Sequence, residues 1–265
     1  GDVCSIVEDQ RGNLWCGTND CGIVAYNPAT GSIRSFRSNE TGLGNDIVIS
    51  STIGKDGALW FGSFNGGLTC FKDGRFKAYR ASTNGKGLVN DNVWALKTEE
   101  NGNIVIATLG GGLQLLNPQT GQFTTYTTHN SPLVSNFLSS IAFDLTGNIL
   151  MGYAQEYSIL DAKTHKIKRL IRPKSHKFLS VSSINQIFVD SRGLLWNAGS
   201  SGLSVYDSQS DSLMTIPLFA DRKAGTAYAI AEDLSHTLWV TTDQGVSHLV
   251  ADKDEGRWNF FVTNY

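Results

Sequence analysis

Cysteine and proline are scarce in this chain, and an excess charge of one sign and long apolar runs are missing. Its 265 residues include 4 Cys and 5 Pro, and 22 basic side chains nearly balance 24 acidic ones. A chain without an overall positive field is a poor nucleic-acid binder. No stretch approaches the roughly 18 apolar residues of a membrane-spanning helix. We therefore expect no nucleic-acid partner, and membrane contact only through a segment that is not in this sequence.

The cysteines are not spaced for a disulfide framework. Pairing the first predicted hairpin across its turn places Cys4 opposite Gly17, so that Cys4 and Cys16 point to opposite faces of the sheet. Cys21 is a diagonal neighbour of Cys16, too far away for comfortable bridging, and Cys70 belongs to a later segment. We interpret all four as small buried residues.

Motifs for catalysis, cofactors and metals are missing as well. The sequence has no Gly-x-Gly-x-x-Gly after a strand, no Gly-x-Ser-x-Gly and no His-Glu-x-x-His, and no Cys-x-x-Cys or His-x-x-x-His. We therefore predict no catalytic residue, no cofactor and no metal. A catalytic site assembled from single residues of several segments stays open.

What the chain does have is 28 Gly and a phrase that returns about every 45 residues. The phrase is Asp-x-x-Gly-x-Leu-Trp, followed after a short gap by a Gly-led apolar run. Its turn position falls at intervals of 45, 45, 45, 46 and 43 residues, at Gly12, Gly57, Gly102, Gly147, Gly193 and His236. Such a period indicates one supersecondary unit copied and stacked.

Each copy holds four short strands. In the first copy, runs of β-branched and aromatic residues at 3–9, 13–18, 22–27 and 33–37 are separated by turn residues at hairpin spacing. Four strands per copy are typical of a propeller blade. We predict an all-β fold, a single β-propeller domain of six four-stranded blades that either close a six-bladed ring or form part of a seven-bladed one. The blades are predicted at approximately 1–42, 43–87, 88–132, 133–178, 179–222 and 223–265.

Two positions of the repeat are predicted to be structural. The second strand carries a large aromatic residue in four copies and an aliphatic one in two, at Trp15, Trp60, Val105, Leu150, Trp196 and Trp239. A periodic indole that tolerates aliphatic replacement suits a wedge between blades better than a ligand platform. The aspartates three residues before the turn position are predicted to bond their own backbone amides, at Asp9, Asp144, Asp190 and Asp233.

The repeat resembles the two-component regulator propeller repeat, whose consensus runs Ile-x-Glu-Asp-x-x-Gly-x-Leu-Trp-x-Gly-Thr and then Gly-Gly-Leu. Residues 3–27 carry nearly all of this wording, and the Gly-Leu element returns at 66–68, 111–113 and 201–203. The family's linking phrase is visible at 42–47 and 87–93. The resemblance covers the whole chain and is weakest in the fourth copy.

The resemblance implies a sensor. Proteins with these repeats are typically hybrid two-component receptors of gut Bacteroidetes, in which periplasmic propellers sense oligosaccharides and a kinase inside induces polysaccharide-utilisation genes. Their ectodomains usually have two seven-bladed propellers and a β-sandwich, so we expect this chain to be a fragment or a smaller relative. The resemblance implies a non-catalytic periplasmic domain of an inner-membrane receptor, with an oligosaccharide ligand and a second propeller or a homodimer partner.

Two other classes of function stay open. Streptogramin-type lyases and sialidases also use propellers, which makes a propeller enzyme (lyase or glycoside-processing) the first alternative. Sialidase boxes place Asp two residues before Gly, however, whereas here the spacing is three, and no arginine triad is evident. The other alternative is a scaffold that binds protein.

If the domain binds a sugar, the expected site is the rim made by the loops between second and third strands and by the connections between copies. Aromatic, amide and carboxylate groups suit a polyhydroxylated ligand. The loop candidates are Asn19, Asp20, Phe64, Asn65, Gln155, Glu156, Tyr157, Asp243 and Gln244; those at the entries to the first strands are Asn92, Trp94, Asn136, Asn185 and Tyr228. Trp94 and Tyr157 are preferred because both break the pattern of the repeat, Tyr157 standing where other copies carry Gly.

A basic run lies after the fourth copy. Seven Lys, Arg and His residues fall within 166–177. The run can attract an anionic ligand, but we interpret it as a solvated edge strand protected by charge.

Overall fold

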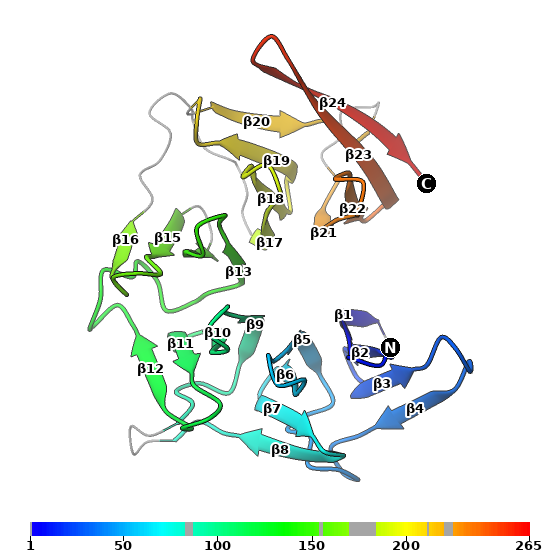
Figure 1. Cartoon of the computed structure of the whole chain (residues 1–265), viewed down its shortest axis with the longest axis vertical. Helices are drawn as coiled ribbons and strands as arrows, with labels where there is room; N and C mark the ends of the chain where they lie inside the picture. Colours follow the sequence, from blue (N-terminus) through cyan, green and yellow to red (C-terminus); the bar gives the residue numbers. More distant parts are fainter. Residues whose placement is uncertain (1, 83–86, 154–155, 170–183, 211, 220–224) are drawn as a thin grey trace. The chain divides into compact units, whose positions relative to one another are not determined.

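The chain is built of β-strands in two compact units. The computed structural model describes residues 2–82, 87–153, 156–169, 184–210, 212–219 and 225–265. The chain divides into unit 1, Gly1–Leu138, and unit 2, Ser139–Tyr265. Each unit contains three antiparallel four-stranded sheets (Figure 1), which confirms the prediction of an all-β fold with six four-stranded blades. In the ranges just given, no helix is both long and apolar enough to cross a membrane.

The three sheets of unit 1 are meanders in which consecutive strands pair. Their first strands are neighbours, because β1 contacts β5 and β5 contacts β9. The bounds are β1 (Val3–Glu8), β2 (Leu14–Thr18), β3 (Ile23–Tyr26) and β4 (Ile33–Phe36); β5 (Val48–Ile53), β6 (Leu59–Ser63), β7 (Gly67–Lys72) and β8 (Arg75–Tyr79); and β9 (Val93–Thr98), β10 (Ile104–Thr108), β11 (Gly112–Leu116) and β12 (Phe123–Tyr126).

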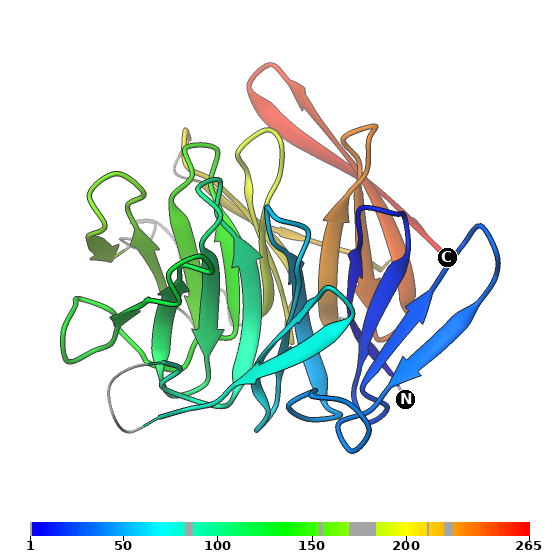
Figure 2. The ribbon, with the colours of Figure 1, turned by 60° about the horizontal axis from the view of Figure 1, so that its bottom comes forward.

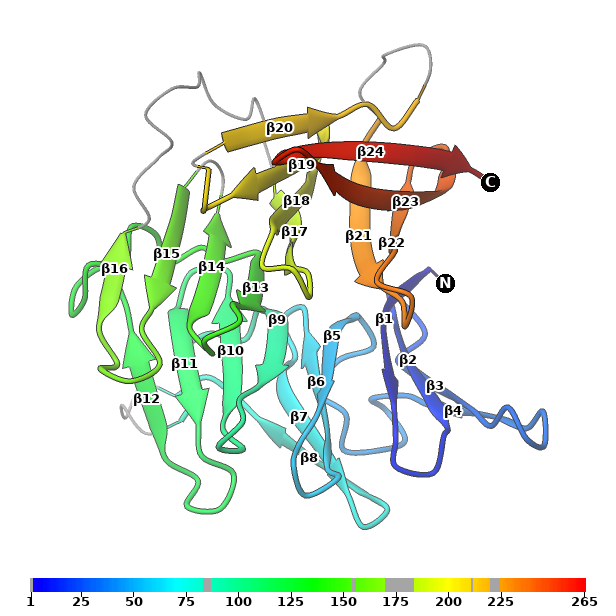
Figure 3. The same cartoon turned by 45° about the horizontal axis from the view of Figure 1, so that its top comes forward.

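Unit 2 repeats this arrangement and ends in a long hairpin. Within it β13 contacts β17 and β17 contacts β21. The last hairpin, β23–β24, lies along β19 and β20 (Figure 3). The bounds are β13 (Ser140–Phe143), β14 (Ile149–Tyr153), β15 (Glu156–Leu160) and β16 (Ile167–Arg169); β17 (Ile184–Val189), β18 (Leu195–Gly199), β19 (Gly202–Asp207) and β20 (Ser212–Ile216); and β21 (Ala227–Glu232), β22 (Leu238–Thr242), β23 (Gly245–Asp254) and β24 (Arg257–Asn264).

The meander gives unit 1 two faces, one at each end of the strands, seen from the side in Figure 2. Turns between the first and second strands of a sheet, and between its third and fourth, lie at one end of the strands; we call this end the turn face, formed by 9–13, 27–32, 54–58, 73–74, 99–103 and 117–122. The other end, the loop face, is formed by 19–22, 37–47, 64–66, 80–82, 87–92, 109–111 and 127–137. The predicted sugar site of unit 1 lies on the loop face.

The repeated aspartate organises the hairpin turn. Asp9 Oδ1 accepts hydrogen bonds from the backbone amides of Arg11 and Asn13, at 2.8 and 3.0 Å. Its Oδ2 accepts from the indole N–H of Trp15, at 2.9 Å. Burial raises the pKa of Asp9, but the hydrogen bonds from Asn13 and Trp15 outweigh it and leave the pKa below its usual value. The same indole-to-carboxylate bond joins Trp196 to Asp190 and Trp239 to Asp233. The predicted turn role is confirmed, because Asp144, Asp190 and Asp233 also accept hydrogen bonds from backbone amides of their turns.

The repeated tryptophans are wedges between neighbouring sheets. The ring of Trp15 lies 6.3 Å from that of Phe61 and 4.7 Å from that of Phe71, both in the second sheet. Trp60 is 2% exposed in a cluster that includes residues of the third sheet, and Trp196 is fully buried in unit 2. The predicted packing role is confirmed at these three positions. Trp239, in the last sheet, is 38% exposed.

The second sheet lacks the turn acceptor, and this predicts a stabilising substitution. Gly54 stands where the first sheet has Asp9, and the buried Nε1 of Trp60 has no hydrogen-bond partner among the residues that the structure describes. A Cβ added at Gly54 would lie 3.2 Å from that nitrogen and 2.9 Å from Asp56 Oδ1, so the exposed Asp56 side chain must turn aside in any variant at this position. We expect Gly54→Asp to raise the free energy of unfolding by about 1 kcal/mol, because it supplies the missing acceptor. Urea unfolding checks this, and Gly54→Ala, which adds the carbon without the acceptor, is the control. Equal gains in both variants would contradict the assignment.

The cysteine predictions need two corrections. All four thiols are free, as expected, but Cys4 is exposed and the other three are half-buried. The predicted pairing is also wrong by one residue: Ser5, not Cys4, lies opposite Gly17. The cause is a β-bulge between Val3 and Ser5, which inserts a residue into β1 and shifts the register. Burial raises the pKa of Cys70 to about 11.

Candidate functional site on the loop face

Three asparagines hold the loop-face connections of unit 1. Asn90 Oδ1 accepts from the backbone N–H of Asn92 at 2.8 Å, and Asn92 Oδ1 accepts from that of Asn65 at 3.0 Å. Asn136 Oδ1 accepts from the backbone N–H of Thr128 at 2.9 Å. The Nδ2 groups of these three asparagines make no hydrogen bond within the described part of the chain. Each side chain is thus oriented by its oxygen and has a free donor.

A buried glutamine fixes the connection that carries Asn90 and Asn92. Gln114, on β11, is fully buried. Its Oε1 accepts from the backbone N–H of Val89 at 3.0 Å, and its Nε2 donates to the carbonyl of Gly87 at 3.0 Å and to Thr125 Oγ1 at 2.9 Å. A fully satisfied buried amide is rigid, because losing any of its bonds would leave a polar atom unpaired away from water.

Exposed aromatic rings stand beside these amides. Phe137 is 64% exposed and Phe64 is 39% exposed. A backbone bridge joins Leu109 to Phe137. A Cβ added at Gly110 would lie 3.9 Å from Phe137 Cε1 and 3.2 Å from Asn90 Nδ2, so the ring and the amide both lie close to the same point beside Gly110. Phe137 and Asn90 were not predicted from the repeat. The sequence feature that could have identified them is their place in the connections between blades.

Trp94 occupies a β-bulge at the start of β9. The pairing of β9 with β10 shifts register between Val93 and Ala95, which leaves Trp94 as the inserted, half-buried residue. In unit 2, Tyr228 is the inserted residue of β21 and is 51% exposed, and Asn185 is the inserted residue of β17. Asn185 Nδ2 donates to the carbonyl of Ala227 at 2.8 Å. Bulges redirect side chains and often occur beside functional sites.

The candidates of the first sheet, Asn19 and Asp20, lie in the β2–β3 turn and are held there by hydrogen bonds. The backbone N–H of Asn19 donates to the carbonyl of Asp2 at 3.0 Å, and the carbonyl of Asp20 accepts from Arg37 Nη1 at 3.4 Å. Cys21 Sγ donates to Asp20 Oδ1, and this bond lowers the pKa of Asp20. Asn19 and Asp20 are both exposed.

In unit 2, Asp243 and Gln244 form the turn between β22 and β23. Both are exposed, and the backbone N–H of Asp243 donates to the carbonyl of Thr226 at 3.1 Å. A Cβ added at Gly225 would lie 2.6 Å from Asp243 Oδ1 and 3.4 Å from Gln244 Nε2, so both side chains lie over this glycine.

The structure corrects the alignment of Tyr157. Tyr157 pairs with Gly152 of the second strand. In the third and fifth sheets the equivalent pairs are Leu113 with Ala107 and Leu203 with Ala198. Tyr157 therefore occupies the core position of the third strand, and Glu156 occupies the place of the glycine. Tyr157 packs against the hydrophobic cluster between β13–β16 and β17–β20, and burial raises its pKa.

Two predictions fall largely outside the described residues. Gln155 lies there, and so does most of the basic run, residues 170–177. Of the described part of the run, Lys168 Nζ pairs with Asp161 Oδ2 at 3.3 Å. Within the described residues, no group of three or more His, Cys, Asp and Glu side chains could hold a metal ion.

Among the predicted candidates, Asn65 and Asn92 are joined by a hydrogen bond, with Phe64 next in the chain. Asn136 lies beside Phe137 and accepts the amides of Gly110 and Gly112 on its carbonyl, both at 2.9 Å. These residues, together with Asn90, define the candidate site of unit 1.

Comparison with known proteins supports the repeat identified above. The model of the two-component regulator propeller family matches residues 1–20. No curated protein sequence matches the chain. Similar solved structures include two from B. thetaiotaomicron: the extracellular domain of the proposed hybrid two-component system BT3049, and that of BT4673, described as a proposed one-component system.

Both of these likenesses are in fold rather than sequence. The BT3049 domain has 18% identity and a TM-score of 0.76, over 93% of this chain and 33% of that one. The BT4673 domain has 18% identity and a TM-score of 0.63, over 99% of this chain and 43% of that one. This chain therefore spans less than half the length of either domain.

A lyase has a similar fold. Virginiamycin B lyase from Staphylococcus aureus, solved as a catalytically inactive variant with quinupristin, has 15% identity and a TM-score of 0.73, over 98% of this chain and 83% of that one. The family match over residues 1–20 confirms the resemblance to the two-component regulator propeller repeat, and the chain is similar in fold to the extracellular domains of BT3049 and BT4673 as well as to a propeller lyase.

Proposed function

We propose that this chain is a non-catalytic, ligand-binding propeller of a periplasmic two-component sensor, and that it detects oligosaccharides to control polysaccharide-utilisation genes. The similarity to extracellular domains of two-component systems supports the general role. One observation supports the ligand class: the exposed ring of Phe137 lies near the amide of Asn90, whose Nδ2 makes no hydrogen bond to any described residue. A pyranose presents a flat face of C–H groups, which suits an aromatic ring, and hydroxyls, which suit amide donors.

The arrangement fits a binding site that is formed before the ligand arrives. Gln114 holds Gly87 and Val89, and the side-chain oxygens of Asn90, Asn92 and Asn136 are already bonded. A preformed site loses less conformational entropy on binding than a mobile one. In this proposal a second propeller or another copy of the receptor completes the signalling unit.

The test is calorimetric titration of the purified chain with an oligosaccharide panel. We expect one class of glycan to bind, and Phe137→Ala to weaken its binding about tenfold, the loss of an aromatic contact worth about 1.4 kcal/mol. Phe261→Ala is the matched control, because Phe261 is 62% exposed but lies on β24 of unit 2. Saturable binding that Phe137→Ala leaves unchanged would remove the site. Turnover of a bound glycan would contradict the non-catalytic assignment.

A further inference from the structure

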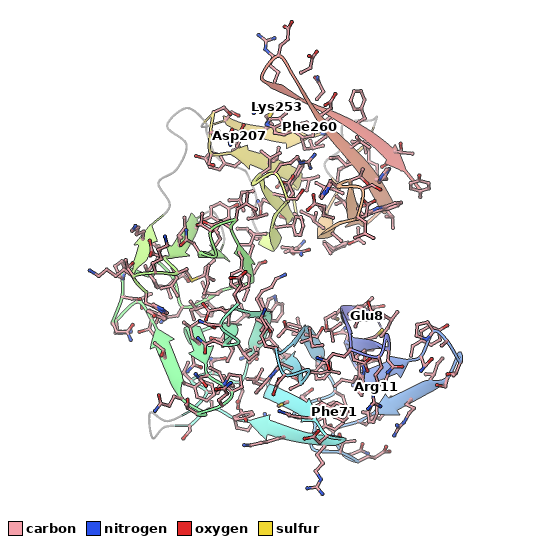
Figure 4. The ribbon with its side chains drawn as sticks, in the orientation of Figure 1. Glu8, Arg11, Phe71, Asp207, Lys253 and Phe260 are labelled. Carbon is pink, nitrogen blue, oxygen red and sulfur yellow. The ribbon has the colours of Figure 1, made fainter. Side chains whose placement is uncertain are left out.

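A cavity of about 500 Å³ lies on the turn face of unit 1, at the opposite end of the strands from the candidate site. Residues of the first two sheets line it, among them Trp15, Phe36 and Phe71, and the basic side chains of Arg11, Arg34 and Lys72. Its volume lies within the range of small-molecule sites, roughly 300–1,000 Å³. Figure 4 labels Arg11, on the β1–β2 turn, and Phe71, on β7 of the neighbouring sheet.

Three packed rings form the apolar wall. Trp15 and Phe36 are stacked, with ring centroids 5.3 Å apart and planes 15° from parallel. Phe71 lies 4.7 Å from Trp15, and its ring is half-buried, as is that of Phe36. The indole N–H of Trp15 is bonded to Asp9, which fixes the ring that Phe36 and Phe71 pack against. The half-buried rings of Phe36 and Phe71 leave apolar surface against which a flat ligand can pack.

Two of the three acids that line the cavity are already engaged. Both oxygens of Asp9 accept hydrogen bonds, from the backbone of Arg11 and Asn13 and from the side chains of Asn13 and Trp15. Asp56 Oδ2 accepts from Lys72 Nζ, and its Oδ1 accepts from the backbone N–H of Ala58. The remaining acid, Asp73, is exposed in the β7–β8 turn.

Two cations, by contrast, are free. The guanidinium groups of Arg11 and Arg34 form no hydrogen bond or ion pair with any residue that the structure describes. The Cζ of Arg34 lies 5.3 Å from the centroid of the Phe36 ring. An arginine next to an aromatic wall, without an acid partner, offers its planar set of N–H donors to a ligand.

We propose that this cavity binds a small ring compound that carries one oxyanion group. The ring lies against the aromatic wall, and the guanidinium groups of Arg11 and Arg34 bind the oxyanion. Arginine binds carboxylate, sulfate and phosphate through paired, charge-assisted hydrogen bonds, which a neutral ring cannot form. This site is independent of the loop-face site and of the proposed sensor role.

The test uses four probes with the full chain, followed by NMR or calorimetry: glucuronate and benzoate, and their neutral counterparts glucose and benzyl alcohol. We expect the anions to bind at least tenfold more tightly than the matched neutral compounds. Tighter binding of glucuronate assigns an acidic sugar, and tighter binding of benzoate assigns an aromatic acid. Arg11→Gln and Arg34→Gln should each weaken the preferred anion about tenfold.

Controls separate this site from general charge effects and from the loop face. Arg257→Gln, which removes an exposed guanidinium from β24 of unit 2, should change nothing. Phe137→Ala should also leave anion binding intact. The proposal is overturned if neither anion binds at millimolar concentration, if the neutral probes bind equally well, or if the Arg11→Gln/Arg34→Gln double variant retains full affinity.

Discussion

Replacing Trp196 with alanine is expected to lower the free energy of unfolding by about 4 kcal/mol. Trp196 is fully buried between the sheets of unit 2, where it packs edge-on to Phe260 with centroids 5.6 Å apart. Its indole N–H donates to Asp190 at 3.0 Å, and Asp190 is itself buried. The substitution therefore leaves a large cavity and removes a donor from a buried carboxylate. Urea unfolding followed by circular dichroism measures the loss.

The same position in the last sheet supplies the matched control. Trp239 makes the equivalent bond to Asp233, at 2.9 Å, but is 38% exposed and packs against His248 on β23 and against Tyr265, just after β24. Trp239→Ala should cost about 2 kcal/mol, roughly half as much, because less surface leaves the core. If Trp196→Ala does not fold, Trp196→Phe gives a milder test. Equal losses of unfolding free energy at the two positions would show that burial between sheets does not determine how much the indole stabilises the fold.

Replacing Asn197 with methionine is expected to raise the free energy of unfolding by about 2 kcal/mol. Asn197 is 3% exposed in the centre of β18, and within the described part of the chain neither its Nδ2 nor its Oδ1 has a hydrogen-bond partner. The hydroxyl of Ser204, its neighbour on β19, has no partner there either. Methionine has as many side-chain heavy atoms as asparagine and is flexible enough to adapt to the site, and it removes the cost of burying an unpaired amide. Thermal and urea unfolding both report the change.

The reverse substitution in another sheet tests the same reasoning. The equivalent position of the fourth sheet is Met151, which is fully buried. Met151→Asn should lower the free energy of unfolding by about 3 kcal/mol, since it buries an amide without partners. A loss of stability in Asn197→Met would instead mean that an internal water satisfies the amide.

The repeat was enough to predict the sheets, because strand and turn formation depend on residues close together in the sequence. A period near 45 residues with turn residues at hairpin spacing determines four short strands, and the aspartate-to-indole bond is local, six residues apart. The role of Trp15 and Trp196 follows from the same periodicity, because an element copied along the chain meets the same neighbour each time. Local patterns thus carried most of the fold.

The details of the site were harder to predict because they depend on register. One inserted residue in β1 changes which residue lies opposite Gly17. The residue types in the bulge do not predict that insertion. Tyr157 was misaligned by one position for the same kind of reason, since a strand that slips by one residue exchanges its core and solvent faces. Phe137 belongs to a connection, where the repeat imposes no pattern.

The Gln114 amide has a consequence for how a signal would travel. This side chain, on β11, is bonded to Gly87 and Val89, so a molecule that contacts Asn90 meets a surface whose geometry was set when the domain folded. Few residues around Asn90 then have to become ordered when the molecule binds. Ligand binding would then be signalled by a change in the surface that unit 1 presents to another protein. It would not be signalled by rearrangement of loops within unit 1.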